Sequence, residues 1–369
     1  MDKEHLRRAI FKVLKKSKLI FNGLEWATGC KDIKVQKQIH SQESAKSTEV
    51  IRKEKNLVRR YWRCGTFHYY RYGLPYLSLS DEELLDYVPT FYHHQRLEKD
   101  HAGIDTVHYG DKLVQAILFK ERNIPTAEVI AFNKGDQWCY FANNQETDII
   151  SLIDGAFQNE KEKLFFKPTG GEGGSGIMVL KRTGNTYLVN GEKTDLSIFL
   201  QTLSKTQFIL QKGIVQTQQM MDINPSSVNT LRVVVQKEGE RMLMKTCIIR
   251  MGRKGKEVDN SAQGGVSVEV DIKTGQVADT ATAEHGGGIL KCHPDTGKAF
   301  GEITINHWES LKQEIETIGT KLIDFKNIAL DIAVTDEGAK LLEFNFRYGI
   351  EHQQCVLGGV RKLLEIYPE

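Results

Sequence analysis

The sequence predicts a mixed α+β fold with a helical extension at its N-terminus, and three observations support this prediction. Apolar runs rich in β-branched and aromatic residues, which are typical of strands, dominate the chain after residue 160. Two helix-like stretches, Leu196–Leu203 and His307–Ile323, interrupt these runs, as expected for α+β layers rather than for a doubly wound sheet. Residues 6–24 have the apolar spacing of an amphipathic helix.

Length and cysteine usage limit the class of protein. The chain has 369 residues, enough for about two or three compact units with a cleft between them. It contains no apolar run close to the ~18 residues that span a bilayer, so a soluble protein is expected. The six cysteines lie far apart, and no cleavable signal sequence opens the chain. A disulfide scaffold and a structural zinc site are therefore disfavoured, and a reduced cytoplasmic setting is expected.

Charge is divided unevenly along the chain. The net charge is only +2, which argues against an electrostatic nucleic-acid binder. Residues 1–60 hold 16 basic and 7 acidic side chains, so this segment carries +9 and the rest of the chain −7. The helix from Leu6 to Leu24 is therefore strongly basic. Two interpretations stay open: the helix packs on its own domain, or residues 1–24 dock on an anionic membrane or a protein partner.

The first third of the chain is expected to be helical. Residues 31–60 are polar and predict an exposed helix or a mobile connector, which completes a basic N-terminal segment over 1–60. A cluster of aromatic residues then begins a helical subdomain over 61–110. Within it, Ser80 followed by Glu83 predicts a capping box at a helix start. Metal binding is not expected of the four histidines, which lack the context of a zinc motif: His93, His94, His101 and His108.

The remainder, over 111–369, is expected to form one larger domain of hairpins. A helix through Leu113–Lys120 leads to a strand at Glu128–Phe132. The later strands are expected at Leu164–Lys167, Ile177–Leu180, Phe208–Gln211, Leu231–Gln236, Arg241–Arg250, Val266–Val270, Ile328–Val334 and Lys340–Asn345.

A glycine-rich loop between two apolar strands is the most informative segment. Residues 170–176 contain five glycines, which let backbone N–H groups approach phosphate oxygens closely. The loop lacks the ending of a Walker motif and returns into a strand, so P-loop and Rossmann folds are disfavoured. Lys167 precedes the loop, and Pro168 biases it toward an extended conformation that would present its charge to phosphates. The alternative is an ordinary flexible hairpin with a surface lysine.

A second hairpin, near the C-terminus, carries oxygen ligands. Glu343 and Asn345 are two residues apart and therefore project from the same face of one strand, and Asp331 on the partner strand can join them. Mg²⁺ prefers such hard oxygen ligands when it also holds substrate phosphates. A solvated strand face is the alternative, and the glycine-rich loop favours the metal site over it, because phosphates and magnesium are used together.

The order of these segments resembles the ATP-grasp superfamily, and most closely its sugar-transfer-associated branch, from about Tyr69 onward. Asp111-Lys112 resembles a stretch of the D-alanine:D-alanine ligases whose lysine reaches an ATP phosphate, and Leu210–Ile214 is similar to the hinge that contacts adenine. The resemblance implies an ATP-grasp fold in which a lid of about 160–215 and a larger subdomain of about 216–369 grip ATP. It implies these nucleotide-binding residues: Lys112, Lys167, Gly173, Gly174, Ser175, Gln211, Lys212, Ile214 and Gln218.

Two further strands extend the resemblance toward the reaction centre. The strand that holds Arg232 and the strand that ends at Arg250 resemble those of the ribosomal-protein glutamate ligases, as does the segment 259–265 that follows. By the same resemblance, Arg232, Arg250 and Lys167 are the catalytic side chains. Two Mg²⁺ ions are implied, on the superfamily's metal triad at Asp331, Glu343 and Asn345.

The resemblance also implies a reaction. ATP-grasp ligases pass the γ-phosphate of ATP to a carboxylate, and an amine attacks the resulting acylphosphate to form an amide. The branch often accompanies cell-surface polysaccharide synthesis, which suggests small-molecule carboxylate and amine substrates that are sugar-linked. The alternative is a phosphotransferase that acts with the same ATP and metal residues on a hydroxyl of a sugar or related small molecule. The sequence does not identify the substrates or the oligomeric state.

Overall fold

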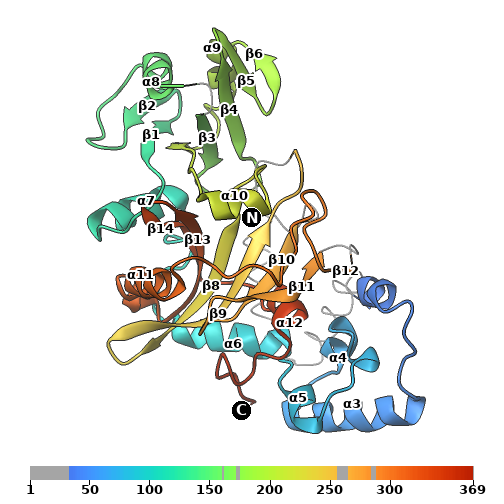
Figure 1. Cartoon of the computed structure of the whole chain (residues 1–369). Helices are drawn as coiled ribbons and strands as arrows, with labels where there is room; N and C mark the ends of the chain where they lie inside the picture. Colours follow the sequence, from blue (N-terminus) through green and yellow to red (C-terminus); the bar gives the residue numbers. More distant parts are fainter. Residues whose placement is uncertain (1–32, 160–161, 172–174, 256–264, 284–287, 369) are drawn as a thin grey trace.

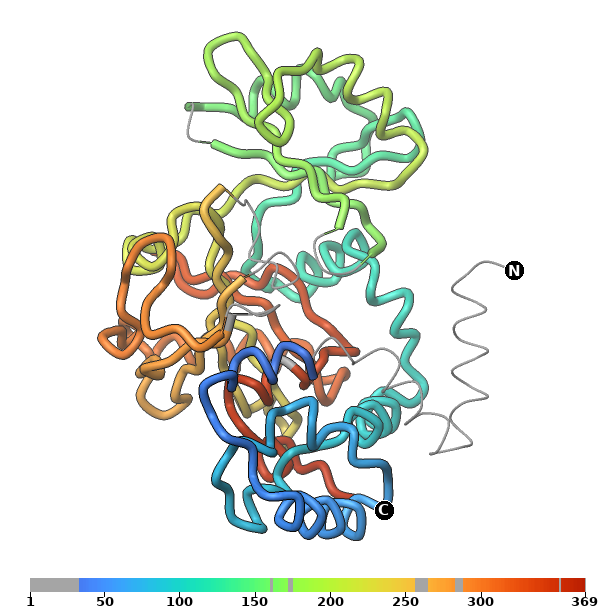
Figure 2. The backbone as a smooth tube through the Cα atoms, turned by 90° about the vertical axis from the view of Figure 1, so that its right-hand side faces the viewer, coloured from blue at the N-terminus to red at the C-terminus, as the bar shows by residue number. Residues whose placement is uncertain are grey.

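A computed structural model describes residues 33–159, 162–171, 175–255, 265–283 and 288–368. The basic helix expected over 6–24 lies outside these residues, as do the expected phosphate contacts Gly173 and Gly174. Figures 1 and 2 show a smaller upper lobe, a larger lobe built on a second sheet, and a group of helices at the end remote from the upper lobe. In the described part of the chain, no helix combines the length and hydropathy needed to cross a membrane.

The upper lobe is built on an antiparallel sheet with strand order β2-β1-β7-β3-β4-β5-β6. Its strands are β1 (Val129–Lys134), β2 (Gln137–Tyr140), β3 (Lys163–Pro168), β4 (Met178–Thr183), β5 (Thr186–Val189), β6 (Glu192–Thr194) and β7 (Phe208–Lys212). Helices α8 (Ile149–Ala156) and α9 (Leu196–Thr202) pack on one face, over a core that includes Phe166 and Leu210. The expected lid of 160–215 is therefore part of a larger unit, because β1 pairs directly with β7.

The larger lobe has a second antiparallel sheet, with strand order β12-β11-β10-β9-β8-β13-β14. Its strands are β8 (Thr230–Glu238), β9 (Arg241–Met251), β10 (Val266–Val270), β11 (Val277–Ala283), β12 (Gly288–Leu290), β13 (Asn327–Thr335) and β14 (Gly338–Asn345). Helices α7 (Lys112–Glu121) and α11 (Trp308–Thr320) contribute to the large core on one face. Leu231 and Val233 of β8 belong to that core, and the alternating residue Arg232 therefore faces the opposite side.

The helices remote from the upper lobe share a core with the larger sheet. They are α3 (Thr48–Trp62), α4 (Phe67–Arg71), α5 (Asp81–Leu85), α6 (Thr90–Asp100) and α12 (Glu351–Leu357). Their core includes Trp62 and Tyr348 together with Val234 and Ala329 of the sheet. The boundary expected after residue 60 falls inside α3, because the end of that helix is buried in this core.

Local expectations in the helical region can be compared with the structure directly. The capping box is confirmed: the Ser80 hydroxyl accepts from the Glu83 backbone, and the Glu83 carboxylate accepts from the Ser80 backbone. His93 and His101 are buried and bond to the backbone carbonyls of Tyr348 and Phe325. Burial lowers the pKa of His93 to about 4, so this ring is neutral and serves packing. In the described ranges, His, Cys, Asp and Glu side chains form no group of three that could hold a metal.

Candidate active site

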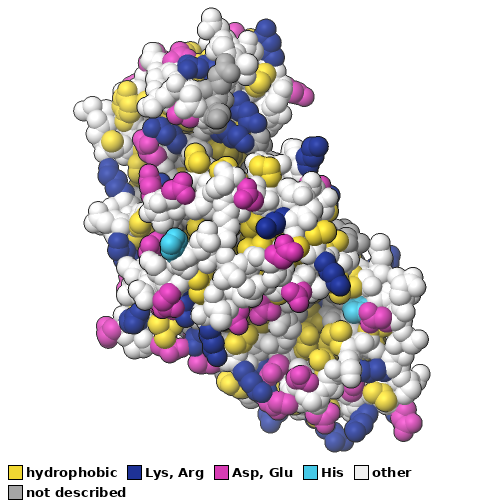
Figure 3. Space-filling view, viewed as in Figure 1, with side chains coloured by type: hydrophobic (Ala, Val, Ile, Leu, Met, Phe, Trp, Pro, Cys, Tyr) yellow, Lys and Arg dark blue, Asp and Glu magenta, His cyan; other side chains and the backbone are white. Residues whose placement is uncertain are grey.

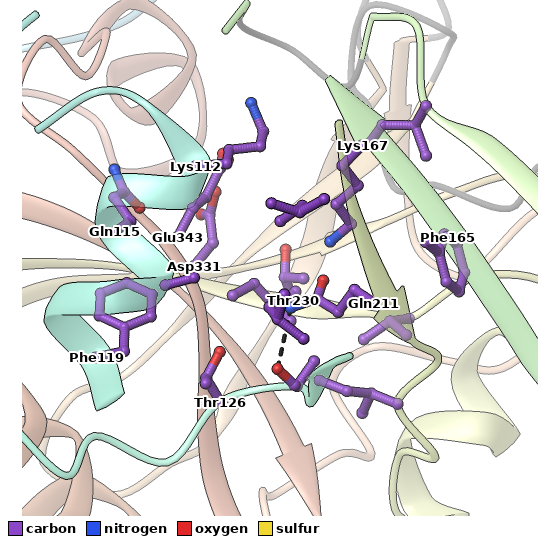
Figure 4. Close-up of a pocket in the computed structure, with 18 of the residues that line it drawn as sticks. Lys112, Gln115, Phe119, Thr126, Phe165, Lys167, Gln211, Thr230, Asp331 and Glu343 are labelled. Atoms are coloured by element: carbon purple, nitrogen blue, oxygen red, sulfur yellow. Dashed lines mark hydrogen bonds between the residues drawn. The ribbon is translucent and has the colours of Figure 1, made fainter. Parts of the chain in front are cut away.

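A cleft lies between the two lobes, where the face of the upper sheet that carries Phe165 and Lys167 meets the polar face of the larger sheet (Figure 4). Its walls come from α7, β3, β7, β8, β9, β13 and β14, so segments far apart in the sequence meet here. The residues of the sequence-based site that line it are Lys112, Lys167, Gln211, Lys212, Ile214, Arg232, Arg250, Asp331, Glu343 and Asn345. Most of the expected site residues therefore lie in one cleft.

Two expected nucleotide-binding residues in the described part of the chain, Gln218 and Ser175, do not line this cleft. Gln218 is the first residue of α10 (Gln218–Ile223), and its side-chain amide donates to Asp222 in the same helix at 2.7 Å. Ser175 is exposed beside the part of the glycine loop that lies outside the described residues. The assignment of these two residues to the nucleotide site therefore remains a prediction.

The register of β13 and β14 places the expected metal ligands together. Asp331 is opposite Glu343 across the hairpin, and Ala329 is opposite Asn345. Asp331 also lies opposite Arg232 of β8 on its other side. Because directly opposed residues share a face of the sheet, the carboxylates and the guanidinium point to one side, into the cleft.

Asp331 is held by two arginines. The Arg232 guanidinium donates to both carboxylate oxygens, from Nε to Oδ1 and from Nη2 to Oδ2, the latter at 2.9 Å. Arg250 approaches the same carboxylate, with Nη1 3.7 Å from Oδ1. Burial alone would raise the pKa of Asp331, but the charges of Arg232 and Arg250 outweigh it and hold that pKa below its ordinary value. Asp331 is therefore ionised.

The pKa of Glu343 is shifted in the opposite direction. Burial, and then the charge of Asp331, raise the pKa of Glu343, while the cations Lys112, Arg232 and Lys167 offset part of the rise. A side-chain hydrogen bond from Glu343 contributes to the low pKa of Asp331. The two carboxyl groups therefore influence each other, because the charge of Asp331 makes ionisation of Glu343 less favourable.

This donor set fits a divalent cation. Two neighbouring carboxyl groups, one buried and one half-buried, are costly to ionise together unless a cation lies between them. Among the residues that the structure describes, the buried side-chain nitrogen of Asn345 has no hydrogen-bond partner, so no such bond fixes the orientation of this amide. Turning it would present its oxygen, which is a ligand for Mg²⁺.

Lys112 connects the site to the glycine-rich loop. Its backbone N–H donates to the carbonyl of Thr169 at 2.8 Å, and its Nζ donates to the carbonyl of Gly171 at 3.0 Å. Asp111 caps the helix by accepting from the N–H groups of the first turn. The start of α7 is thus tied to the strand end that leads into the loop. Figure 4 shows Lys112 and Lys167 on opposite walls of the cleft.

The hinge side of the cleft is apolar with fixed polar groups. The Gln211 amide, 4% exposed, donates to the carbonyl of Ala127 at 3.1 Å. A Cβ at Gly213 would lie 3.0 Å from the carbonyl oxygen of Lys163 and 3.2 Å from the Phe165 ring, so a larger residue there would need its neighbours to shift by a few tenths of an ångström. Phe165 and the hinge residues Gln211, Lys212 and Ile214 line this side of the cleft.

Some residues of the cleft were not expected from the sequence. Phe165, Thr126 and Thr230 line it and belong to strands or turns whose apolar pattern gave no functional signal. Gln115 is buried in the cleft wall three residues after Lys112. A polar residue on the buried face of an otherwise apolar helix was the available signal for it.

Two lobes that close on a cleft lined by lysines, arginines and a carboxylate hairpin are the arrangement of the ATP-grasp fold. The model of the family described as sugar-transfer associated ATP-grasp matches residues 102–365. The chain therefore belongs to this family, and the fold expected from the sequence is confirmed.

Similar solved structures are distant. D-alanine–D-alanine ligase from Bacillus anthracis aligns at 13% identity and a TM-score of 0.37, over 70% of this chain and 66% of that chain. N5-carboxyaminoimidazole synthase from Aspergillus clavatus aligns at 10% identity and a TM-score of 0.40, over 77% of this chain and 59% of that chain. D-alanine–D-alanine ligase from Helicobacter pylori aligns at 12% identity and a TM-score of 0.36, over 71% of this chain and 59% of that chain. This chain thus spans less than two thirds of each of these chains, and such similarities do not assign an activity. No curated protein matches the sequence significantly.

Proposed function

We propose that the protein is an ATP- and Mg²⁺-dependent ligase that joins a carboxylate to an amine through an acylphosphate. One observation supports this most directly. The buried Asp331 and the half-buried Glu343 face four cationic side chains in a single cleft: Lys112, Lys167, Arg232 and Arg250. A polyphosphate with its metal fits this combination of charges, because the cations offset the phosphates and the carboxylates hold the metal.

The adenine ring would lie against the hinge at Gln211, Lys212 and Ile214, where the cleft is narrow and apolar. The phosphates would then extend toward Lys112 and Lys167. Mg²⁺, two ions by the family resemblance, would be held by Asp331, Glu343 and Asn345 and would offset charge on the terminal phosphates.

The side chains of the protein then offset charge and position the reacting groups, and none of them acts as a nucleophile. An oxygen of the substrate carboxylate attacks the γ-phosphorus, and the bond to ADP breaks. The amine nitrogen attacks the acyl carbon of the resulting acylphosphate, loses a proton, and phosphate leaves with one oxygen of the original carboxylate. Arg232 and Arg250 would turn from Asp331 to the transferred phosphoryl group and the developing oxyanion. The lid would exclude water that hydrolyses the intermediate.

The substrate class follows from the family's association with sugar transfer. We infer a uronic or amino acid as the carboxylate and an amino acid or amino sugar as the amine, acting in cell-surface polysaccharide or sugar-conjugate synthesis. The reaction would take place in the cytoplasm, which supplies ATP.

A mass-spectrometric screen tests this proposal. The protein is incubated with ATP, Mg²⁺, hydroxylamine and a panel of uronic and amino acids, with Glu343→Gln as the matched control. A ligase forms ADP and a hydroxamate, because hydroxylamine replaces the amine and traps the acylphosphate. A phosphotransferase would form a stable phosphate ester and no hydroxamate, and that result would contradict the ligase.

We also propose that the N-terminal segment docks the enzyme on an anionic surface. Helix α3, which follows residues 1–24 in the same basic segment, supports this. Four exposed cations on α3 share one face at helical spacing: Arg52, Lys53, Arg59 and Arg60. None of the four forms an ion pair within the residues that the structure describes. Figure 3 shows Lys and Arg side chains, interspersed with Asp and Glu side chains, along the lower edge of the molecule, where α3 runs.

A further inference from the structure

The strand that carries two of the expected metal ligands lies at the edge of its sheet. β14 is the last strand in the order of the larger sheet, and β13 is its neighbour on the inner side. An edge strand presents backbone N–H and C=O groups that need other partners. Glu343 and Asn345 point into the cleft, whereas Phe344 between them is buried in the core. The N–H and C=O groups of Phe344, which point outward from the sheet edge, are therefore the free backbone groups closest in sequence to both ligands.

A single side chain binds both of these groups. The Gln115 amide nitrogen donates to the carbonyl of Phe344 at 2.9 Å, and the Phe344 N–H donates to the Gln115 amide oxygen at 3.2 Å. The same nitrogen donates its second hydrogen to the carbonyl of Tyr109 at 3.0 Å. Gln115 is only 4% exposed, and its amide thus takes the place of a neighbouring strand.

Gln115 also connects the edge strand to the phosphate side of the cleft. It lies three residues after Lys112, so both side chains lie on one side of α7. The backbone of Lys112 is in turn bonded to Thr169 at the start of the glycine-rich loop. One short helix therefore joins the loop to the strand of Glu343 and Asn345.

We propose that Gln115 is a positioning residue for the metal site: its amide fixes the Phe344 peptide and thereby sets the spacing of Glu343 and Asn345. This inference rests on the proposed function, because it assigns these two side chains to Mg²⁺. Residues that orient metal ligands through hydrogen bonds affect metal affinity without touching the metal. An apolar residue of similar size at position 115 would fill the same space but leave the Phe344 peptide free to turn.

The chain offers a matched control. The Gln354 amide of α12 makes the same two-bond pairing with one backbone residue: the Val88 N–H donates to its oxygen at 2.6 Å, and its nitrogen donates to the Val88 carbonyl at 3.0 Å. Gln354 is 1% exposed and does not line the cleft. Gln354→Leu therefore removes an equivalent buried pairing from the same chain, away from Glu343 and Asn345.

The test measures ADP binding by calorimetry on the full chain, with Mg²⁺ and with a chelator in its place. In the wild-type protein Mg²⁺ should increase ADP affinity. Gln115→Leu should reduce this increase by about tenfold or more, the scale for residues that orient metal ligands, while affinity in chelator changes little. Gln354→Leu should keep the wild-type increase in ADP affinity with Mg²⁺, even if it lowers the melting temperature as much as Gln115→Leu does. Gln115→Met is a second variant that keeps an unbranched side chain with good helix propensity.

Three results would overturn the inference. An unchanged Mg²⁺-dependent increase in Gln115→Leu or Gln115→Met would show that the amide does not position the ligands. A failure of both variants to fold, while Gln354→Leu folds, would assign Gln115 a purely structural role. If the wild-type protein binds ADP without any effect of Mg²⁺, the metal assignment of the proposed function fails, and the role of Gln115 fails with it.

Discussion

Asp331 has two kinds of charged neighbour: two arginines and the carboxyl group of Glu343. Arg232 and Arg250 favour its ionised form, whereas its charge raises the pKa of the neighbouring Glu343. A divalent cation would favour the ionised form of both carboxylates, and a phosphate would draw the arginines away from Asp331. The metal and the phosphates are therefore expected to bind together rather than one after the other.

The raised pKa of Glu343 makes metal binding dependent on pH. Below that pKa the carboxyl keeps its proton, so MgADP should bind more weakly, by up to about tenfold for each pH unit, and the affinity should level off above it. The charged groups around Glu343 that set its pKa are Asp331, Lys112, Arg232 and Lys167. Calorimetry in buffers of different ionisation enthalpy should detect the proton released on binding, and Glu343→Gln should abolish both the release and the pH dependence. Binding without proton release would contradict the raised pKa of Glu343 as the origin of the pH dependence.

Lys167 is expected to bind a phosphate while contributing little to stability. It is half-buried near the end of β3, with its Nζ 5.9 Å from the centre of the Phe165 ring. Lys167→Ala should weaken ATP binding by about 10- to 100-fold, the scale of one charge-assisted hydrogen bond, with a melting temperature close to that of the wild type. Lys193→Ala, at an exposed position of β6 in the same sheet, serves as the control. Unaltered ATP affinity in folded Lys167→Ala would remove Lys167 from the site.

At the scale of elements, the strands with continuous apolar runs were predictable and the short polar ones were not. β13 is buried along its whole length, and β8 is buried from Thr230 to Gln236 except at Arg232; their expected ranges differ from the structure only at the ends. β6 has three residues, exposed or half-buried, and its sequence carries no apolar run. The preceding turn was a missed signal, since Asn190 and Gly191 both have positive φ, as a tight hairpin requires.

The candidate site was predictable only in part, for a similar reason. Charged residues in unusual positions, such as Lys167 before the glycine loop and Arg232 within an apolar strand, stand out in the sequence. Gln115 does not, because its role depends on the edge of a strand more than 200 residues later. Contacts of this kind follow from the packing of α7 on β14, which local patterns do not contain.

The helical subdomain and the larger sheet are expected to unfold together, since they share one core. Trp62 of α3 is fully buried there, and the Tyr92 hydroxyl donates to its carbonyl. Trp62→Ala should lower the free energy of unfolding by about 3–5 kcal/mol, the cost of removing a large buried ring, whereas Trp62→Phe should cost less. Urea unfolding followed by far-ultraviolet circular dichroism measures both. A separate early transition for the helices would show that the subdomain is independent.

At the scale of the whole molecule, the basic α3 lies at the end remote from the upper lobe, so docking through it leaves the cleft free (Figures 1 and 2). Deleting residues 1–24, or replacing Arg59 and Arg60 by glutamine, should weaken binding to vesicles rich in anionic lipid. Each basic residue near such a surface contributes about 1 kcal/mol, so the double replacement should cost about tenfold or more, and added salt should reduce the difference. Neutral vesicles and ADP binding serve as controls.

Two outcomes would contradict this docking. Equal binding of all variants to anionic vesicles would exclude these side chains from the interface. An insoluble protein after deletion of residues 1–24 would show instead that the basic helix packs on its own domain.

The central claim is that ATP activates a carboxylate as an acylphosphate, and transfer of oxygen isotope tests it most directly. The carboxylate found by the hydroxylamine screen is labelled with ¹⁸O and incubated with the enzyme, ATP, Mg²⁺ and its amine. Since the phosphate that leaves an acylphosphate keeps one carboxylate oxygen, ADP and phosphate should form in equal amounts, with one ¹⁸O in each phosphate. Retention of all ¹⁸O in a phosphorylated organic product, without free phosphate, would contradict the ligase and identify transfer to a hydroxyl.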